Sequence, residues 1–362
     1  GDAAVICPWV VYERYGDERV LRDQFPSMKG WVEYIRAQGE NEFLWNTGFH
    51  FGDWLGLDAK ENSYVGATPR ELIATAFYAY STGIVAKAAK VLGLEKEAKE
   101  YSELRDRVAS AFREEFVTPS GRVASPTQTA YAVALMFDLL EEKDRRQAAD
   151  RFAKLIEESG TQLTTGFVGT PYLCHVLTRF GYGELAYKLL ERREYPSWLY
   201  PVVRGATTIW EHWDGIKPDG SFWSDDMNSY NHYAYGAVGD WLFGSVAGID
   251  ADENDPGYRR IKLSPLPGGS LRHAEATLDS PYGEIRSAWK RLSNGGIVYE
   301  MTVPANASAD VVLPGAKLGS VLESGRPLET AEGVSDAAES ADGLRFRLGS
   351  GAYRFELAQP AK

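Results

Sequence analysis

The sequence has few of the residues that build metal centres and disulfide frameworks. It contains only 5 His and 2 Cys in 362 residues, and no HExxH or CxxC spacing occurs. Cys7 and Cys174 each fall inside an apolar helical pattern, which predicts two buried thiols and no disulfide. A phosphate-cradling glycine loop and a nucleophile elbow are also missing. The sequence therefore predicts a protein that uses no metal ion and no other cofactor.

Positive charge is also in deficit. The 39 Lys and Arg are outnumbered by 51 Asp and Glu, which gives a formal net charge of −12. Nucleic acids and anionic membrane surfaces bind basic faces, so this charge argues against both as partners. No apolar run approaches the roughly 20 residues of a membrane-spanning helix. The sequence leaves the compartment open and favours the cytoplasm over the alternatives.

Apolar and aromatic residues are plentiful. The chain is 44% hydrophobic and 12% aromatic, with 20 Tyr and 10 Trp. This length and composition fit a soluble protein of about two domains, each with a sizeable core. So many aromatic rings suit carbohydrate binding, but they are equally suited to a core.

The first two thirds of the chain carry helical periodicity that comes in pairs. Thr68-Pro69-Arg70-Glu71 predicts a helix start, with Thr68 as N-cap and Glu71 completing a capping box. No simple sequence repeat accompanies the pairs, which weighs against a TPR or HEAT array. An α/α toroid, with inner helices forming a ring wall and loops at one end forming a pocket, explains the pattern better. The predicted helices cover residues 3–15, 17–35, 68–92, 95–116, 127–140, 143–158, 171–180, 184–193 and 231–246.

The composition changes after Asp250. Asp255-Pro256-Gly257 marks a boundary, and short alternating segments separated by turn signals follow it. Asn294-Gly295 is typical of a tight hairpin turn. The sequence thus predicts an (α/α)6-barrel domain over residues 1–255, with its N-terminal helices missing, and an antiparallel β-sandwich over residues 256–362. Strands are expected at 259–263, 271–278, 283–291, 297–303, 309–312 and 344–356.

One loop stands apart from the rest, the segment GATTIWEHWDG at 205–215. In it Glu211 lies between Trp210 and Trp213, with His212 and Asp214 beside them. Aromatic faces stack on the apolar faces of sugar rings, and a carboxylate among them activates water or binds hydroxyl groups. The alternative is a loop over a helical core, with Glu211 in a salt bridge and both indoles buried. We expect a sugar site here.

Hydrolysis of a glycosidic bond needs two carboxyl groups, one to protonate the leaving oxygen and one to activate water or attack the sugar. Most acidic side chains are simply solvated. Asp53 stands out because it lies in the aromatic run Phe51-Gly52-Asp53-Trp54. His232 opens the last predicted helix and is expected at the same end of the ring, although a capping or core histidine explains it equally well. The acids on loops of the helical domain are Asp2, Glu42, Asp53, Glu211, Asp214, Asp225 and Asp226.

Several of these runs, taken together and in order, resemble a known family. The chain is similar to the bacterial α-L-rhamnosidases of the (α/α)6-barrel type over its whole length, and the run Ala-Thr-Thr-Ile-Trp-Glu is specific. The matching runs are Gly1-Asp2-Ala3, FGDWL at 51–55, TQTAY at 127–131, TGF at 165–167, GTPYL at 169–173, GATTIWE at 205–211, NHYA at 231–234 and DSPYGEI at 279–285.

The resemblance implies roles for individual residues. It implies an inverting glycoside hydrolase in which Glu211 is the general base. Trp54 would form a wall of the rhamnose pocket, His232 would bind sugar hydroxyls, and Asp2 would contact the sugar. We therefore expect Glu211 as the catalytic residue. The expected substrate-binding residues are Asp2, Asp53, Trp54, Trp210, Trp213 and His232.

The chain departs from the family pattern at its start. In the family the general acid is a glutamate in an Arg-x-Glu-Arg run, just ahead of a Gly-Trp-x-Gly-Asp motif. Gly1-Asp2 resembles the last two residues of that motif. The resemblance therefore implies that the acid and a pocket tryptophan precede this chain, whose expected partner is the N-terminal remainder of the same polypeptide.

The leading hypothesis is removal of terminal, non-reducing α-L-rhamnose from oligosaccharides, glycoconjugates or plant glycosides. Another (α/α)6 exo-glycosidase is one alternative. A polysaccharide lyase is a second, although a lyase would use Tyr, His and Arg in an open cleft, which the loop around Glu211 does not suggest. The third alternative is a sugar-binding fragment that retains Trp54, Glu211 and His232 but has no turnover.

Overall fold

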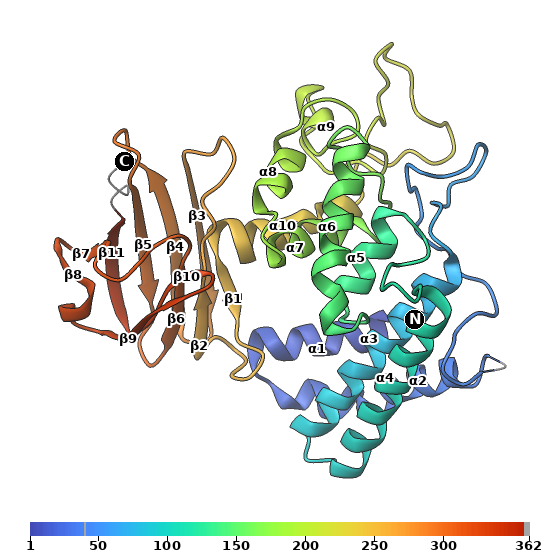
Figure 1. Cartoon of the computed structure of the whole chain (residues 1–362), viewed down its shortest axis with the longest axis horizontal. Helices are drawn as coiled ribbons and strands as arrows, with labels where there is room; N and C mark the ends of the chain where they lie inside the picture. Colours follow the sequence, from blue (N-terminus) through green and yellow to red (C-terminus); the bar gives the residue numbers. More distant parts are fainter. Residues whose placement is uncertain (40, 358–362) are drawn as a thin grey trace. The chain divides into compact units, whose positions relative to one another are not determined.

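A computed structural model describes residues 1–39 and 41–357 of the chain (Figure 1). The chain divides into two compact units. The first comprises Gly1–Trp9 and Leu21–Val238, and the second comprises Val10–Val20 and Gly239–Lys362. The domain limits at residues 255 and 256 stay a prediction.

The first unit is built from helical hairpins. Helix α3 packs against α4, α5 against α6, and α7 against α8, while α5 also contacts α3 and α7. The helices that lie wholly or partly in this unit are α1 (Ala3–Tyr15), α2 (Glu18–Arg36), α3 (Arg70–Val91), α4 (Glu95–Phe116), α5 (Gln128–Met136), α6 (Glu142–Glu158), α7 (Thr170–Arg179), α8 (Gly183–Glu191), α9 (Leu199–Val203) and the 3-10 helix η1 (Ala234–Ala237).

Two kinds of helix alternate along this unit. Helices α3 and α5 are rich in alanine and buried on nearly all sides, whereas α4 and α6 each bury one stripe and expose a charged face. This pattern is typical of an inner layer of helices covered by an outer layer. Since each outer helix carries the chain back before the next inner helix begins, α3, α5 and α7 start at one end of the unit. The loops that precede them therefore gather there.

Three local predictions were wrong. The capping box does not form, because α3 begins after Pro69 without a side-chain cap and the hydroxyl of Thr68 pairs with that of Thr127, 2.6 Å away. The helix predicted over 231–246 is instead a 3-10 turn, the short helix α10 (Val238–Trp241) and the π-helical turn η2 (Leu242–Ala247). Cys174 is buried as expected, but Cys7 lies on an exposed face of α1.

The second unit contains two β-sheets. Their strand orders are β1-β2-β6-β10-β9 and β3-β4-β5-β11-β7-β8. The two sheets confirm the predicted antiparallel sandwich: all neighbouring strands are antiparallel except β2 and β6, which run parallel. The strands are β1 (Ile249–Ala251), β2 (Arg260–Leu263), β3 (His273–Ser280), β4 (Gly283–Arg291), β5 (Ile297–Val303), β6 (Ser308–Leu313), β7 (Val321–Glu323), β8 (Arg326–Pro327), β9 (Val334–Ser340), β10 (Gly343–Leu348) and β11 (Gly351–Leu357).

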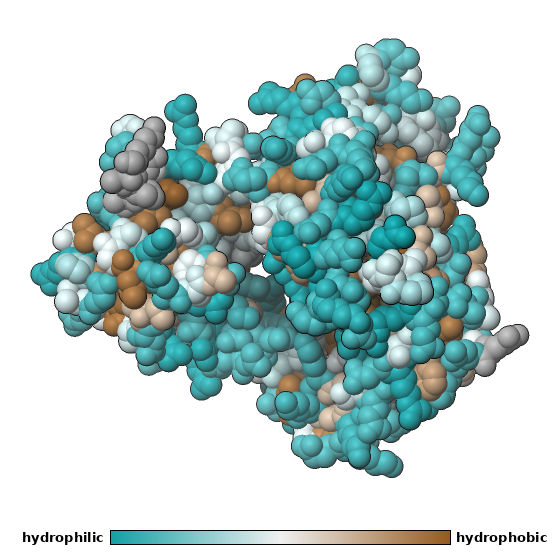
Figure 2. Space-filling view, viewed as in Figure 1, coloured by the Kyte–Doolittle hydropathy of each residue, from teal (hydrophilic) through white to brown (hydrophobic). Residues whose placement is uncertain are grey.

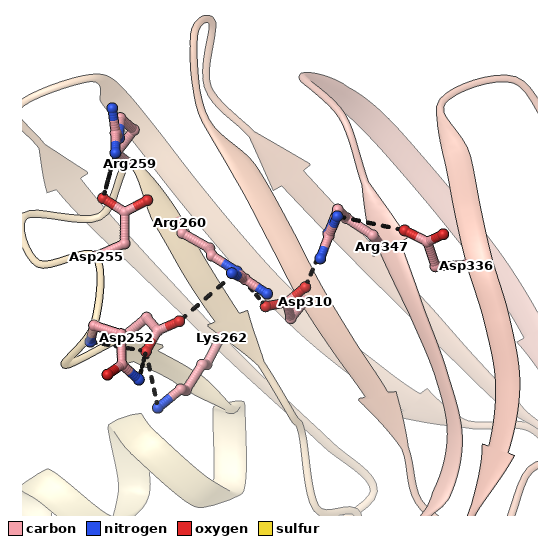
Figure 3. A network of polar contacts seen from close by, with 9 residues as sticks. Asp252, Asp255, Arg259, Arg260, Lys262, Asp310, Asp336 and Arg347 are labelled. Atoms are coloured by element: carbon pink, nitrogen blue, oxygen red, sulfur yellow. Dashed lines mark hydrogen bonds and ion pairs between the residues drawn. The ribbon is translucent and has the colours of Figure 1, made fainter.

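A row of charges crosses the five-stranded sheet (Figure 3). Asp310 on β6 accepts hydrogen bonds from Arg260 on β2 at 2.5 Å and from Arg347 on β10 at 3.2 Å. Arg347 also pairs with Asp336 on β9, and Arg260 with Asp252. Asp310 thus joins the middle strands of this sheet through their side chains as well as through their backbones.

One face of the surface is mostly polar. On the face drawn in Figure 2, hydrophilic residues cover most of both units and hydrophobic ones occur in small scattered groups. None of the helices within residues 1–39 and 41–357 is both long and apolar enough to cross a membrane.

Candidate active site

Loops from three parts of the first unit meet where α3, α5 and α7 begin. The aromatic loop before α3 is tied to the loop before α7 by backbone hydrogen bonds from Leu57 to Thr164 and from Phe167 to Trp54, at 2.8 and 2.9 Å. The loop before α7 touches the segment after Glu211 because the ring of Phe167 stacks on that of His232. The structure therefore brings Asp53, Trp54 and His232 into one connected cluster.

Asp53 lies at the centre of these ties, with 1% of its surface exposed. Its Oδ1 accepts hydrogen bonds from the backbone N–H groups of Val168 at 2.8 Å and Gly169 at 3.2 Å. Its Oδ2 accepts from Gly166 N–H at 2.8 Å and from the hydroxyl of Thr129. Burial raises the pKa of Asp53, and these four hydrogen bonds oppose the rise. The carboxylate is thus held by protein donors on both oxygens.

Trp54 is half-buried in a row of aromatic rings. Its ring lies 6.1 Å from that of Phe51 and 5.5 Å from that of Tyr64, and Tyr64 in turn lies 5.9 Å from Trp223. The ring of His212 stacks on Trp223 with centroids 3.6 Å apart. This row joins the aromatic loop before α3 to the loop that carries Glu211, and it offers the flat apolar faces on which a sugar ring stacks.

Glu211 is held by the returning part of its own loop. Its backbone N–H donates to the carbonyl of Ser229 at 2.8 Å, and the N–H of Ser229 donates to Glu211 Oε2 at 2.9 Å. The residue is 9% exposed. Its other oxygen, Oε1, has no hydrogen-bond partner in the part of the chain that the structure describes. One oxygen is thus fixed by the protein and the other is not.

The two indoles beside Glu211 are buried, with Trp210 at 6% and Trp213 at 3% exposure. The ring of Trp210 meets that of Tyr230 edge-on, and Trp213 stacks on Tyr235 with centroids 3.9 Å apart. The indole N–H of Trp213 is buried without a hydrogen-bond partner among the described residues. Both rings therefore pack beneath the loop.

His232 is half-buried at the end of the same loop. The backbone N–H of His232 donates a hydrogen bond to the backbone carbonyl of Ile209 at 2.8 Å, and this bond closes the segment around Glu211. Its ring lies 4.9 Å from that of Phe167, with the two planes inclined by 25°. The imidazole orientation is therefore set by a residue of the loop before α7.

Asp2 lies elsewhere in the same unit. Its Oδ1 accepts hydrogen bonds from the indole of Trp31 at 3.0 Å and from the hydroxyl of Ser81 at 2.9 Å. A cavity of about 650 Å³ lies beside it, and its wall includes Trp45, Phe51 and Val168. Asp2 thus shares a cavity with the aromatic loop.

The other acidic candidates differ in setting. Glu42 is exposed and paired with Arg36, and Asp225 and Asp226 are exposed. Asp214 is half-buried and burial raises its pKa; it lines a cavity of about 190 Å³.

Tyr235 was not predicted from the sequence. It is buried, and its pKa is raised well above the ordinary value, first by burial and then by the charges of neighbours that include Asp53, Glu211 and Asp214. Its ring also contacts those of Trp213 and Phe167. Tyr235 therefore lies among the acids of the site. The only signal for it in the sequence is its position three residues after His232.

Helical hairpins with acids and aromatic rings gathered at one end, followed by a β-sandwich, are the architecture of the six-hairpin glycosidases. The model of the bacterial α-L-rhamnosidase six-hairpin glycosidase domain matches residues 1–246, and that of the bacterial α-L-rhamnosidase C-terminal domain matches residues 248–326. The chain belongs to the bacterial α-L-rhamnosidase family.

Individual relatives agree with this assignment. The chain is 40% identical to an α-L-rhamnosidase of Streptomyces avermitilis over 358 residues, which cover 99% of this chain and 32% of the relative. An α-L-rhamnosidase of Formosa agariphila is 40% identical over 316 residues, 87% of this chain and 34% of its own length. The chain thus spans about a third of the curated relatives it matches.

Solved structures of two such relatives share the fold. The crystal structure of the Streptomyces avermitilis α-L-rhamnosidase complexed with L-rhamnose matches 98% of this chain and 32% of that chain, with a TM-score of 0.88 and 39% identity. The native enzyme from Aspergillus terreus matches 100% of this chain and 39% of that chain, with a TM-score of 0.87 and 32% identity.

Proposed function

We propose that the protein removes terminal, non-reducing α-L-rhamnose from rhamnosides by an inverting mechanism, with Glu211 as general base. Membership of the family and the L-rhamnose complex of the Streptomyces relative support this substrate class. The observation that carries the proposal is the carboxylate of Glu211. Ser229 holds one of its oxygens, and the other has no partner within the described residues.

In this mechanism Glu211 Oε1 accepts a proton from a water molecule as that water attacks C1 of rhamnose. The C1–O bond to the leaving group breaks on the opposite face, and the leaving oxygen is protonated by a general acid. Because the attack and the departure occur on opposite faces, the product forms first as β-L-rhamnose. The hydrogen bond from Ser229 fixes the carboxylate, so little reorganisation accompanies proton transfer.

We propose that the general acid lies outside residues 1–362. Among the candidates of the site, Asp53 has both oxygens occupied by protein donors. Within residues 1–39 and 41–357, Asp2 accepts hydrogen bonds from Trp31 and Ser81 on Oδ1 alone. Asp2 and Asp214, whose pKa burial raises, are therefore the alternatives within the chain.

We propose that Trp54 and His232 contact the sugar, Trp54 through its ring face and His232 through hydrogen bonds to hydroxyl groups. Asp2 contributes through the cavity it shares with the aromatic loop. Trp213 lines the smaller cavity beside Asp214. The burial of Trp210 favours a role in supporting Glu211.

The stereochemistry of the first product tests this proposal. Proton NMR of an aryl α-L-rhamnoside during early hydrolysis by the full-length protein should show the anomeric signal of β-L-rhamnose before mutarotation. An initial α-L-rhamnose signal would contradict inversion, and no hydrolysis of any α-L-rhamnoside would contradict the substrate class.

A further inference from the structure

We infer that Asp53 is a positioning residue, which fixes Trp54 and the Phe167–His232 pair relative to each other without touching the sugar. This inference rests on the proposed function, because it assigns Trp54 and His232 to rhamnose binding. The side chain of Asp53 is fully enclosed by protein.

An anion-binding turn precedes α7. The N–H groups of Gly166, Val168 and Gly169 converge on the Asp53 carboxylate at 2.8, 2.8 and 3.2 Å. Converging N–H groups at a helix start bind an anion. Here the anion is a side chain from a loop more than a hundred residues earlier in the chain, so the turn serves as a fastener between two loops.

The two loops approach each other closely. A Cβ atom on Gly166 would lie 2.2 Å from the carbonyl oxygen of Trp54, and one on Gly169 would lie 2.3 Å from the hydroxyl oxygen of Thr129. Glycine at both positions therefore permits an approach that no other residue allows. The carbonyl of Trp54 also accepts a hydrogen bond from the N–H of Phe167 at 2.9 Å.

The joined loops position both proposed sugar contacts. Trp54 follows Asp53 directly in the chain, so the fastener sets the position of its backbone. Phe167 lies between two of the N–H donors, and its ring stacks on His232 and meets Tyr235 edge-on at 5.1 Å. Asp53 therefore acts on both proposed rhamnose contacts. Glu211 is held by its own hydrogen bonds to Ser229, so its position does not depend on Asp53.

Replacing Asp53 with Asn in the full-length protein tests the inference. The amide supplies one acceptor oxygen and places an NH2 group against N–H donors, so the two loops separate. We expect KM for an aryl α-L-rhamnoside and Kd for L-rhamnose to rise roughly tenfold to a hundredfold, with a smaller change in kcat. The backbone amides of Gly166, Val168 and Gly169 should lose hydrogen-exchange protection.

Asp58 offers a matched control. It lies in the same aromatic loop, and its carboxylate accepts a hydrogen bond from Ala67 N–H at 2.8 Å, within that loop. Asp58→Asn should leave KM, Kd and the protection of residues 166–169 unchanged. Should Asp53→Asn fail to fold, Thr129→Val removes one donor while keeping the three amides. It should then raise KM by a smaller factor, and Thr129→Ser should restore it.

The two proposals fail separately. If the protein neither hydrolyses rhamnosides nor binds L-rhamnose, the proposed function is wrong, and the amide protection of residues 166–169 still decides the role of Asp53 as fastener. If the protein is active but Asp53→Asn retains normal KM, Kd and amide protection, the inference about Asp53 is overturned. An equal loss of affinity in Asp58→Asn would also overturn it.

Discussion

Glu211 and Ser229 are joined by two hydrogen bonds, one between backbone groups at 2.8 Å and one from the N–H of Ser229 to Glu211 Oε2 at 2.9 Å. The loop around Glu211 lacks regular secondary structure, but these two bonds hold its carboxylate against the backbone of Ser229. A general base must keep one orientation throughout the approach of water, and this pairing provides it.

Trp54→Ala should narrow the preference for α-L-rhamnosides over α-L-mannosides. The two sugars share ring stereochemistry and differ at C6, where rhamnose carries a methyl group. Burial of that methyl against the indole is worth roughly 1 kcal/mol, or about fivefold in kcat/KM. The ratio of kcat/KM for the two aryl glycosides measures this preference. The control is Trp54→Phe, which keeps an aromatic ring at this position and should retain more of the preference. An equal loss on both substrates would mean that Trp54 shapes the site without contacting the methyl group.

Acidification should destabilise the loop around Glu211 through His212. Burial lowers the pKa of His212 from its ordinary value of 6.5, against the opposing charge of Glu211 and its hydrogen bond to Met227. The folded state thus prefers the neutral ring. The neutral His212 ring therefore contributes fully to the free energy of unfolding above pH 6.5. This contribution is lost as the pH falls through the lowered pKa of His212 in the folded state.

Thermal unfolding at a series of pH values measures this dependence. His212→Phe retains a ring against Trp223 and should flatten the decline in Tm below pH 6.5. His273→Gln, on the exposed start of β3, should keep the decline. A wild-type Tm that stays constant as the pH falls below 6.5 would contradict the role given to His212.

The sequence identified the hairpins because each outer helix presents one apolar stripe to an inner one. It also identified Glu211 and Trp54 as candidates, through the rarity of tryptophan beside an acid and through the family's motifs. It did not show what Asp53 binds, because its partners at 129 and 166–169 become neighbours only when the hairpins pack. The capping box at Thr68 failed for the same reason, since a tertiary partner, Thr127, takes the hydroxyl group.

The end of the helical unit illustrates a second limit. Periodicity predicted one helix over 231–246, but the chain forms a 3-10 turn, a short α-helix and a π-helical turn there. Helical segments of all three kinds place apolar residues at similar spacings, so the pattern alone does not distinguish them. The parallel pairing of β2 with β6 is likewise set by the connections between distant strands.

Asp310→Asn should lower the stability of the second unit by about 0.5–1 kcal/mol, because the residue is partly exposed and solvent screens its ion pairs. The Arg260 and Arg347 guanidinium groups would lose their shared partner. Thermal unfolding in low salt should show the decrease, and high salt should reduce it. Asp342→Asn, which removes an exposed pair with Arg345, is the control and should have less effect. Equal shifts for both variants would contradict a role for the charge row.

The most direct measurement of the central claim is the turnover of Glu211→Ala in the full-length protein, with and without azide. Loss of a general base should reduce kcat for an aryl α-L-rhamnoside by at least about a hundredfold, while L-rhamnose still binds. Azide needs no base, so it should restore turnover and give β-L-rhamnosyl azide, with the C1–N bond formed on the face opposite the departing aryl oxygen. Near-normal turnover without azide, or an α-configured azide product, would contradict the role of Glu211.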